Sequence, residues 1–128
     1  MPLTAEPKDV LIQSIDSLTV AELDALPHGA IQLDASGIIL QYNSFESELA
    51  NVSQDAAIGK NFFKELAPCT DVQAFYGKFK EGVAAKELYA RFQYHFSFKH
   101  QPRDVVVTMY YSGITHTVWV FIRPLGYS

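Results

Sequence analysis

The sequence predicts an α+β domain in which helices cross one face of a five-stranded antiparallel sheet. Apolar and polar residues alternate over 90–98 and two further apolar runs follow, which indicates three strands toward the C-terminus. Two short apolar runs flank a glycine-containing turn at 34–37, which indicates a β-hairpin. Residues 43–88, between these two groups of strands, carry helical signals. This order is typical of an α+β domain, and it suits a small pocket between sheet and helices.

Residues 1–27 are predicted to form a helical cap on the sheet, added to a core of residues 28–128. Thr19 followed three residues later by Glu22 has the pattern of a capping box, and Pro27 ends the short turn that it opens. Upstream, a few apolar residues recur at helical spacing: Val10, Leu11, Ile15 and Leu18. Because so few apolar residues anchor this segment, we expect it to open more easily than the core.

The hairpin and several short helices are predicted over residues 29–70. The apolar runs at 30–33 and 38–42 are its strands, and Gly37 suits a positive φ in the turn. Asn43 or Ser44 can cap a helix through Glu48, and Ser53 can cap another that Gly59 stops. Phe62, Phe63 and Leu66 suggest one more helical turn. Several short helices in succession imply a segment that wraps around and encloses an interior space.

The longest helix is predicted over residues 71–88, with Asp71 as its cap. Phe75, Phe79 and Val83 lie four residues apart and share one face. After it, the alternating segment places Phe92, Phe96 and Phe98 on one side of a strand. Turns at 101–102 and 112–113 separate the next strands, 105–111 and 115–122. In the last strand, Trp119 and Phe121 face one side while Val118 and Val120 face the other.

Composition excludes several classes of protein. The chain has 128 residues, a formal charge of −4 and one cysteine, so no internal disulfide and no multi-cysteine metal site can form. The acidic excess argues against non-specific nucleic-acid binding. No apolar run approaches the length of a membrane span, and the first ten residues lack the apolar core of a signal peptide. We therefore expect one soluble cytoplasmic domain, with no nucleic-acid or membrane partner.

The cysteine, Cys69, has two interpretations from the residues alone. Most free cysteines are small buried hydrophobic residues, and that is the more frequent case. The other is a nucleophile or attachment point, since the start of a helix at 71 would favour a thiolate. Four histidines could serve as bases, but none has a motif relation to Cys69: His28, His95, His100 and His116. A thiol-dependent enzyme is therefore disfavoured, and by spacing alone Tyr42 and Glu46 form an ordinary pair.

Several segments together resemble the photoactive yellow protein family, the blue-light receptors of the PAS superfamily. The hairpin carries the resemblance first, in residues 29–34 and 39–43. The run 58–64 leads into Ala67-Pro68-Cys69-Thr70, and the block 75–83 follows. Trp119-Val120-Phe121 closes the last strand. The stretch from Ala67 through the 75–83 block is specific to this family, whereas residues 1–27 match it only loosely.

The resemblance implies a PAS fold and a sensory role without enzymatic turnover. It implies that Cys69 carries p-coumaric acid (4-hydroxycinnamic acid) as a thioester, with Tyr42 and Glu46 donating hydrogen bonds to a buried phenolate. Light would isomerise the chromophore from trans to cis, Glu46 would give up its proton, and the buried charge would drive partial unfolding, followed by dark recovery. Pocket or supporting positions would be Ala50, Val52, Phe62, Ala67, Pro68, Thr70, Phe96, Phe98, His100 and Trp119.

The chain departs from the family pattern at several of these positions. Ala50 stands where the family usually has threonine, and Val52 where it usually has arginine. These changes remove a hydrogen bond and a cation, so we expect the phenolate to be held less firmly. His100 replaces a methionine that assists dark recovery, which predicts slower recovery and leaves room for a proton relay. Ser97 and Phe98 replace a common aspartate and tyrosine.

Two function classes stay open beside the light sensor. One is a chromophore-free PAS-like module that binds another ligand or a protein, and the other is the disfavoured acyl-transfer enzyme. The joint presence of Tyr42, Glu46 and Cys69 favours the sensor, because a chromophore-free module does not need all three. We expect a monomer or weak dimer that signals by transient contact with an unidentified downstream protein. We expect no metal.

Overall fold

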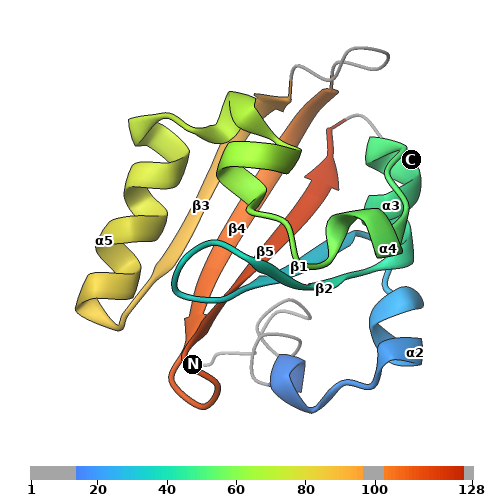
Figure 1. Ribbon diagram of the computed structural model, residues 1–128, viewed down its shortest axis with the longest axis horizontal. Helices are drawn as coiled ribbons and strands as arrows, with labels where there is room; N and C mark the ends of the chain where they lie inside the picture. Colours follow the sequence, from blue (N-terminus) through green and yellow to red (C-terminus); the bar gives the residue numbers. More distant parts are fainter. Residues whose placement is uncertain (1–13, 97–102, 126–128) are drawn as a thin grey trace, which may run out of the picture.

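A computed structural model describes residues 14–96 and 103–125 of the chain. Five strands form one antiparallel sheet in the order β2-β1-β5-β4-β3. Figure 1 shows the green turns that precede α5 in front of the strands, with α2 apart from them beside the sheet. The strands are β1 (Gly29–Leu33), β2 (Ile39–Tyr42), β3 (Tyr89–Phe96), β4 (Arg103–Ser112) and β5 (Thr117–Pro124). The predicted five-stranded antiparallel sheet is confirmed.

The hairpin and the alternating strand form as predicted. The β1–β2 turn places Gly37 at φ 89°, a conformation that L side chains rarely adopt. Strand β3 pairs with β4 along its whole length, from Tyr89 opposite Tyr110 to Phe96 opposite Arg103. Phe98, His100 and the expected turn at 101–102 lie outside the described residues.

The helical segments differ from the sequence prediction in their bounds. Asn43 and Ser53 cap α3 (Ser44–Ala50) and α4 (Gln54–Ala57) through their side chains, as expected. One prediction is wrong in its bounds: the helical stretch covers 73–85 and not 71–88. That stretch holds a π-helical turn at Gln73–Gly77 and then α5 (Lys78–Ala85). Asp71 caps neither, because its carboxylate pairs instead with Lys64 at 2.8 Å.

The inner face of the sheet carries the main core. The helices contribute phenylalanines that are at most 2% exposed, and β4 and β5 contribute aliphatic side chains from alternate positions. The aromatic members are Tyr42, Phe62, Phe63, Phe75, Phe79, Phe96 and Tyr111. The core therefore lies between the sheet and the segment 44–85, where the predicted pocket belongs. Among the described residues, no helix is long and apolar enough to cross a bilayer.

A second cluster lies on the outer face of the sheet, under the N-terminal segment. Ile15 and Leu23 pack there on Ala30, Trp119 and Phe121. The predicted capping box of α2 (Val20–Asp24) is confirmed, with Thr19 and Glu22 exchanging hydrogen bonds of 2.8 and 3.1 Å. Upstream, Ile15–Ser17 form a 3-10 turn, and Val10 and Leu11 of the expected helical spacing lie outside the described residues. We call residues 15–26 the cap.

Candidate functional site

Tyr42 and Glu46 bring two buried polar groups to one end of the core. Tyr42 ends β2, and Glu46 occupies the first turn of α3, so one helical turn separates them. Each side chain is 2% exposed. Neither Tyr42 Oη nor Glu46 Oε1 has a hydrogen-bond partner among the described residues. Buried polar atoms are nearly always paired, so two such orphans indicate that something else normally meets them.

Burial keeps both groups protonated at neutral pH. Loss of hydration raises the pKa of Glu46 to about 8, because an ionised carboxylate is poorly stabilised in the core. The same burial, reinforced by the charge of Glu46, raises the pKa of Tyr42 above its ordinary value. A protonated carboxyl and a phenol each carry an O–H group. The pair can therefore present two hydrogen-bond donors to one acceptor.

Asn43 fixes the position of Glu46 and joins it to the cap. Its Oδ1 accepts hydrogen bonds from the backbone N–H of Glu46 at 3.1 Å and of Ala30 at 3.0 Å. Its Nδ2 donates to the carbonyls of Leu23 at 2.8 Å and His28 at 3.0 Å. The sequence identifies Asn43 as the N-terminal residue that caps a helix. Its hydrogen bonds to the cap, residues 15–26, form only because folding brings that segment next to α3.

Gly29 makes room for the Glu46 carboxyl group. A Cβ atom at this position would clash with Glu46 Oε1 and lie 3.3 Å from Glu46 Cδ. We therefore expect Gly29→Ala to lower the free energy of unfolding by about 1–3 kcal/mol through overpacking. Gly113→Ala is the matched control, since nothing lies within 4 Å of a Cβ there. Urea titrations of both variants measure the effect, and equal losses would contradict it.

Cys69 lies in a 3-10 turn, Pro68–Thr70, that borders the same core. Its side chain is half-buried against the main cluster. The predicted helix N-terminus is absent here, because Val72 is extended and separates the turn from the helical segment that follows. The turn is held instead by Thr70, whose Oγ1 donates to Ala67 O at 2.6 Å, and by Tyr94, whose hydroxyl donates to the carbonyl of Cys69. The sequence did not single out Tyr94.

Comparison with known proteins places this arrangement in a family. The family model of the PAS fold matches residues 17–125. The photoactive yellow protein of Rhodothalassium salexigens is 48% identical over 103 residues, which are 80% of this chain and 82% of that protein. That of Halochromatium salexigens is 41% identical over 117 residues, covering 91% of this chain and 94% of that protein. This chain belongs to the photoactive yellow protein family.

Solved structures agree with the family assignment. The photoactive yellow protein domain from the sensor histidine kinase Ppr of Rhodospirillum centenum superposes with a TM-score of 0.84 at 45% identity, covering 88% of this chain and 98% of that one. A PAS domain of an HTR-like protein from Haloarcula marismortui, at 13% identity and a TM-score of 0.66, shares the fold. The predicted PAS fold is confirmed. Members of the photoactive yellow protein family are sensory photoreceptor modules, not enzymes, and the chain is a sensory PAS module of this family.

The other predicted pocket residues fall into three groups. Phe62, Ala67 and Phe96 are buried in the main cluster, and Val52 packs against it. Ala50 is half-buried at the end of α3, whereas Pro68 is exposed at the start of its turn. The prediction for Trp119 is wrong, because β5 alternation turns its ring to the outer cluster under the cap, where it stacks on Phe121 with centroids 6.3 Å apart.

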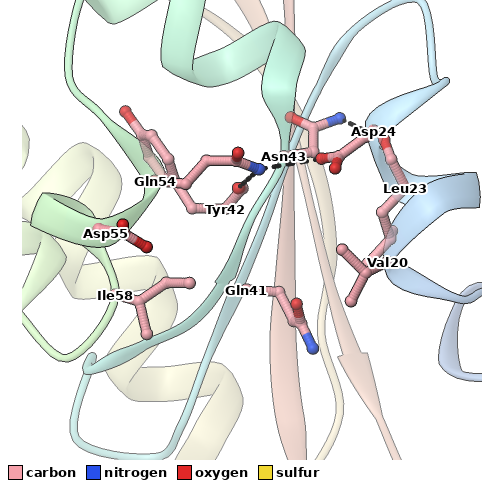
Figure 2. A pocket seen from close by; sticks show the side chains of 9 residues that line it. All are labelled: Val20, Leu23, Asp24, Gln41, Tyr42, Asn43, Gln54, Asp55 and Ile58. Atoms are coloured by element: carbon pink, nitrogen blue, oxygen red, sulfur yellow. Dashed lines mark hydrogen bonds between the residues drawn. The ribbon is translucent and has the colours of Figure 1, made fainter.

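A groove of about 220 Å³ opens where the cap meets β2 and α4 (Figure 2). Gln54 reaches across one side of it, and its Nε2 donates to Tyr42 O and to Asp24 Oδ1, both at 2.9 Å. The lining residues are Val20, Leu23, Asp24, Gln41, Tyr42, Asn43, Gln54, Asp55 and Ile58. Tyr42 lines it, whereas Glu46 and Cys69 do not, so it holds only one of the three residues predicted to bind the chromophore. In the described part of the chain, no three acidic, histidine or cysteine side chains gather as a metal site.

Proposed function

We propose that this chain is a blue-light receptor that carries p-coumaric acid as a thioester on Cys69. The observation that supports this best is the pair of orphaned atoms, Tyr42 Oη and Glu46 Oε1. Both belong to buried groups that keep their protons at neutral pH, and both lack an acceptor among the described residues. A phenolate oxygen is an acceptor that such a pair of donors fits. Cys69 borders the same core and supplies the attachment point.

The residue types suit a buried phenolate. An ionised phenol is destabilised in an apolar core, because it loses its hydration. Hydrogen bonds to a charged acceptor contribute about 1.5–3 kcal/mol each, so two donors offset much of that cost. A neutral Glu46 can donate where an ionised one would repel the phenolate. Ala50 has no hydroxyl with which to orient Tyr42, and Val52 carries no charge, which supports a weaker hold on the phenolate than the family pattern implies.

The protein's response follows from the environment of Glu46. When bound, the chromophore supplies a visible-light-absorbing phenolate and a double bond that isomerises from trans to cis. Glu46 would then pass its proton to the phenolate oxygen and become a buried carboxylate, which has no cationic partner among the described residues. Such a charge costs several kcal/mol, a large share of the 5–15 kcal/mol stability of a domain of this size. Opening the structure near Glu46 hydrates the charge, and Asn43 leads from there to the cap.

The decisive experiment loads the apoprotein with activated p-coumaric acid. We expect the wild type to turn yellow and to gain the mass of one p-coumaroyl group, and Cys69→Ala to do neither. Tyr94→Phe is the control, since it keeps the thiol and alters only the hydrogen bond to the Cys69 carbonyl. A wild-type chain that gains no mass would contradict the proposal and would favour the chromophore-free PAS-like module. Signal output would pass by transient contact with an unidentified downstream protein.

A further inference from the structure

Three hydrogen-bond donors from β4, β5 and the turn between them converge on one carboxylate of the cap, that of Asp16. Trp119 Nε1 donates to Asp16 Oδ1 at 3.0 Å, and Ser112 Oγ donates to Oδ2 at 2.5 Å. Thr115 Oγ1 adds a third bond to Oδ1 at 3.2 Å. The four residues come from opposite ends of the chain. The cap is therefore held by a specific polar contact as well as by apolar packing, which the sequence did not predict.

None of the donors belongs to the cap: they lie in β4, in β5 and in the turn between them. Ser112 ends β4 and is fully buried, and Trp119 lies in β5 and is 2% exposed. The backbone N–H groups of Ile114 and Thr115 donate to Ser112 Oγ at 3.2 and 3.3 Å, so they occupy its acceptor side and leave its proton for Asp16. With the cap displaced, these donors would be free to receive another carboxylate, and we call their site the recess.

Apolar surface adjoins the recess. The stacked rings of Trp119 and Phe121 form it together with Ala30, and the cap covers it with Ile15, directly before Asp16, and with Leu23. The cap thus occupies the face as an intramolecular ligand. The groups with which it binds are an aspartate carboxylate and the neighbouring aliphatic side chains.

We propose that the sheet face under the cap is a docking surface for a partner protein segment that presents an aspartate beside aliphatic side chains. The cap imitates this partner segment and prevents it from binding as long as the cap itself covers the sheet face. The idea that light opens the cap rests on the proposed function. The recess and its selectivity for an aspartate do not. The partner is therefore expected to compete with Ile15 and Asp16 for the same donors.

The test uses the full-length apoprotein in the dark, with the cap loosened by Leu23→Ala. Leu23 is 4% exposed in the outer cluster, so its truncation weakens cap packing. Hydrogen exchange verifies the opening, and Ile15→Ala serves if Leu23→Ala leaves the cap closed. The probe is a synthetic peptide with the sequence of residues 14–26, and its twin carries Asn in place of Asp16. Titration calorimetry measures the binding of both.

We expect the wild-type peptide to bind at least tenfold more tightly than its Asn twin, because hydrogen bonds to a charged acceptor are the strong ones. Adding Ser112→Ala to the loosened protein should lower its affinity for the wild-type peptide and leave its affinity for the Asn twin unchanged. Thr108→Val is the matched control: Thr108 lies on the same sheet face, and no hydrogen bond joins it to Asp16. It should affect neither peptide.

Three outcomes would overturn the proposal. The two peptides could bind equally, the wild-type peptide could fail to bind a variant whose cap is shown to be open, or the loosened variant could form a dimer that excludes the peptide. The last would assign the face to a second copy of the chain. Because no chromophore and no light are used, failure of these titrations is distinguishable from failure of the proposed function. Chromophore loading can succeed while the peptides fail, and the reverse also holds.

Discussion

Glu46→Gln is expected to abolish a fall of about 5 kcal/mol in the free energy of unfolding of the apoprotein between pH 4.5 and pH 8. In the folded wild type, burial raises the pKa of Glu46 from 4.5 to about 8. Each pKa unit of difference between folded and unfolded states corresponds to about 1.4 kcal/mol. Glutamine has nearly the same shape and no ionisation, so the pH-dependent part of the stability disappears with it.

The sign of this effect follows from proton binding. Between pH 4.5 and 8 the folded state keeps the Glu46 proton and the unfolded state has lost it, so stability falls as the pH rises. The stabilisation is complete below pH 4.5 and is lost by the time the pH passes 8. His28 acts in the opposite direction: burial lowers its pKa, so its contribution to stability is lost as the pH falls below 6.5. A slope of the opposite sign from His28 should therefore persist in the glutamine variant.

Urea unfolding at a series of pH values between 4 and 9 measures both chains. Glu48→Gln is the matched control, because Glu48 lies on the same helix and is exposed. It should follow the wild-type curve. If the Glu46→Gln variant lost stability with rising pH as steeply as the wild type, the carboxyl of Glu46 would be hydrated in solution, and its proposed role as a neutral donor would be wrong.

The elements that the sequence predicted are those whose signals are local. Strand β3 was visible because side chains alternate along any strand, and α2 because the Thr19–Glu22 capping box closes within four residues. The hairpin turn was visible because Gly37 suits its positive φ. Such patterns need no knowledge of what packs above them. The five-stranded sheet follows from them.

The features that the sequence missed depend on residues far apart in the chain. Trp119 faces the cap because β5 alternation, fixed by its pairing with β4, turns Val118 and Val120 inward. Asp16 reaches Trp119 across 103 positions of sequence. A periodicity within one element cannot reveal any of these contacts.

Tyr42 and Glu46 show both what a local sequence pattern can predict and what only the folded chain reveals. Spacing alone gave Tyr42 and Glu46 no distinction, and only the family resemblance gave them a role. Their burial without partners comes from the fold, since β2 and α3 carry both into the core. A sequence pattern can supply the two donors, but it takes the packing around them to remove every other acceptor.

Asn43→Ala is expected to lower the free energy of unfolding by about 3 kcal/mol. Loss of an N-terminal cap alone costs about 1 kcal/mol. Asn43 is 2% exposed and serves four backbone groups, two as acceptor and two as donor. Its truncation leaves the N–H of Ala30 and the carbonyls of Leu23 and His28 without this partner in a buried place, and each such group adds to the cost.

Asn61→Ala is the matched control for this prediction. Asn61 also caps a helical turn through Oδ1, with bonds of 3.0 Å to the N–H groups of Phe63 and Lys64, and its Nδ2 donates to Ser36 O at 2.9 Å. Its site is more open to water, so its loss should cost about 1 kcal/mol. Hydrogen exchange should show the α2 amides exchanging faster in Asn43→Ala only. If the two variants lost equal stability, water would replace the Asn43 amide, and Glu46 and the cap would not be joined through this side chain.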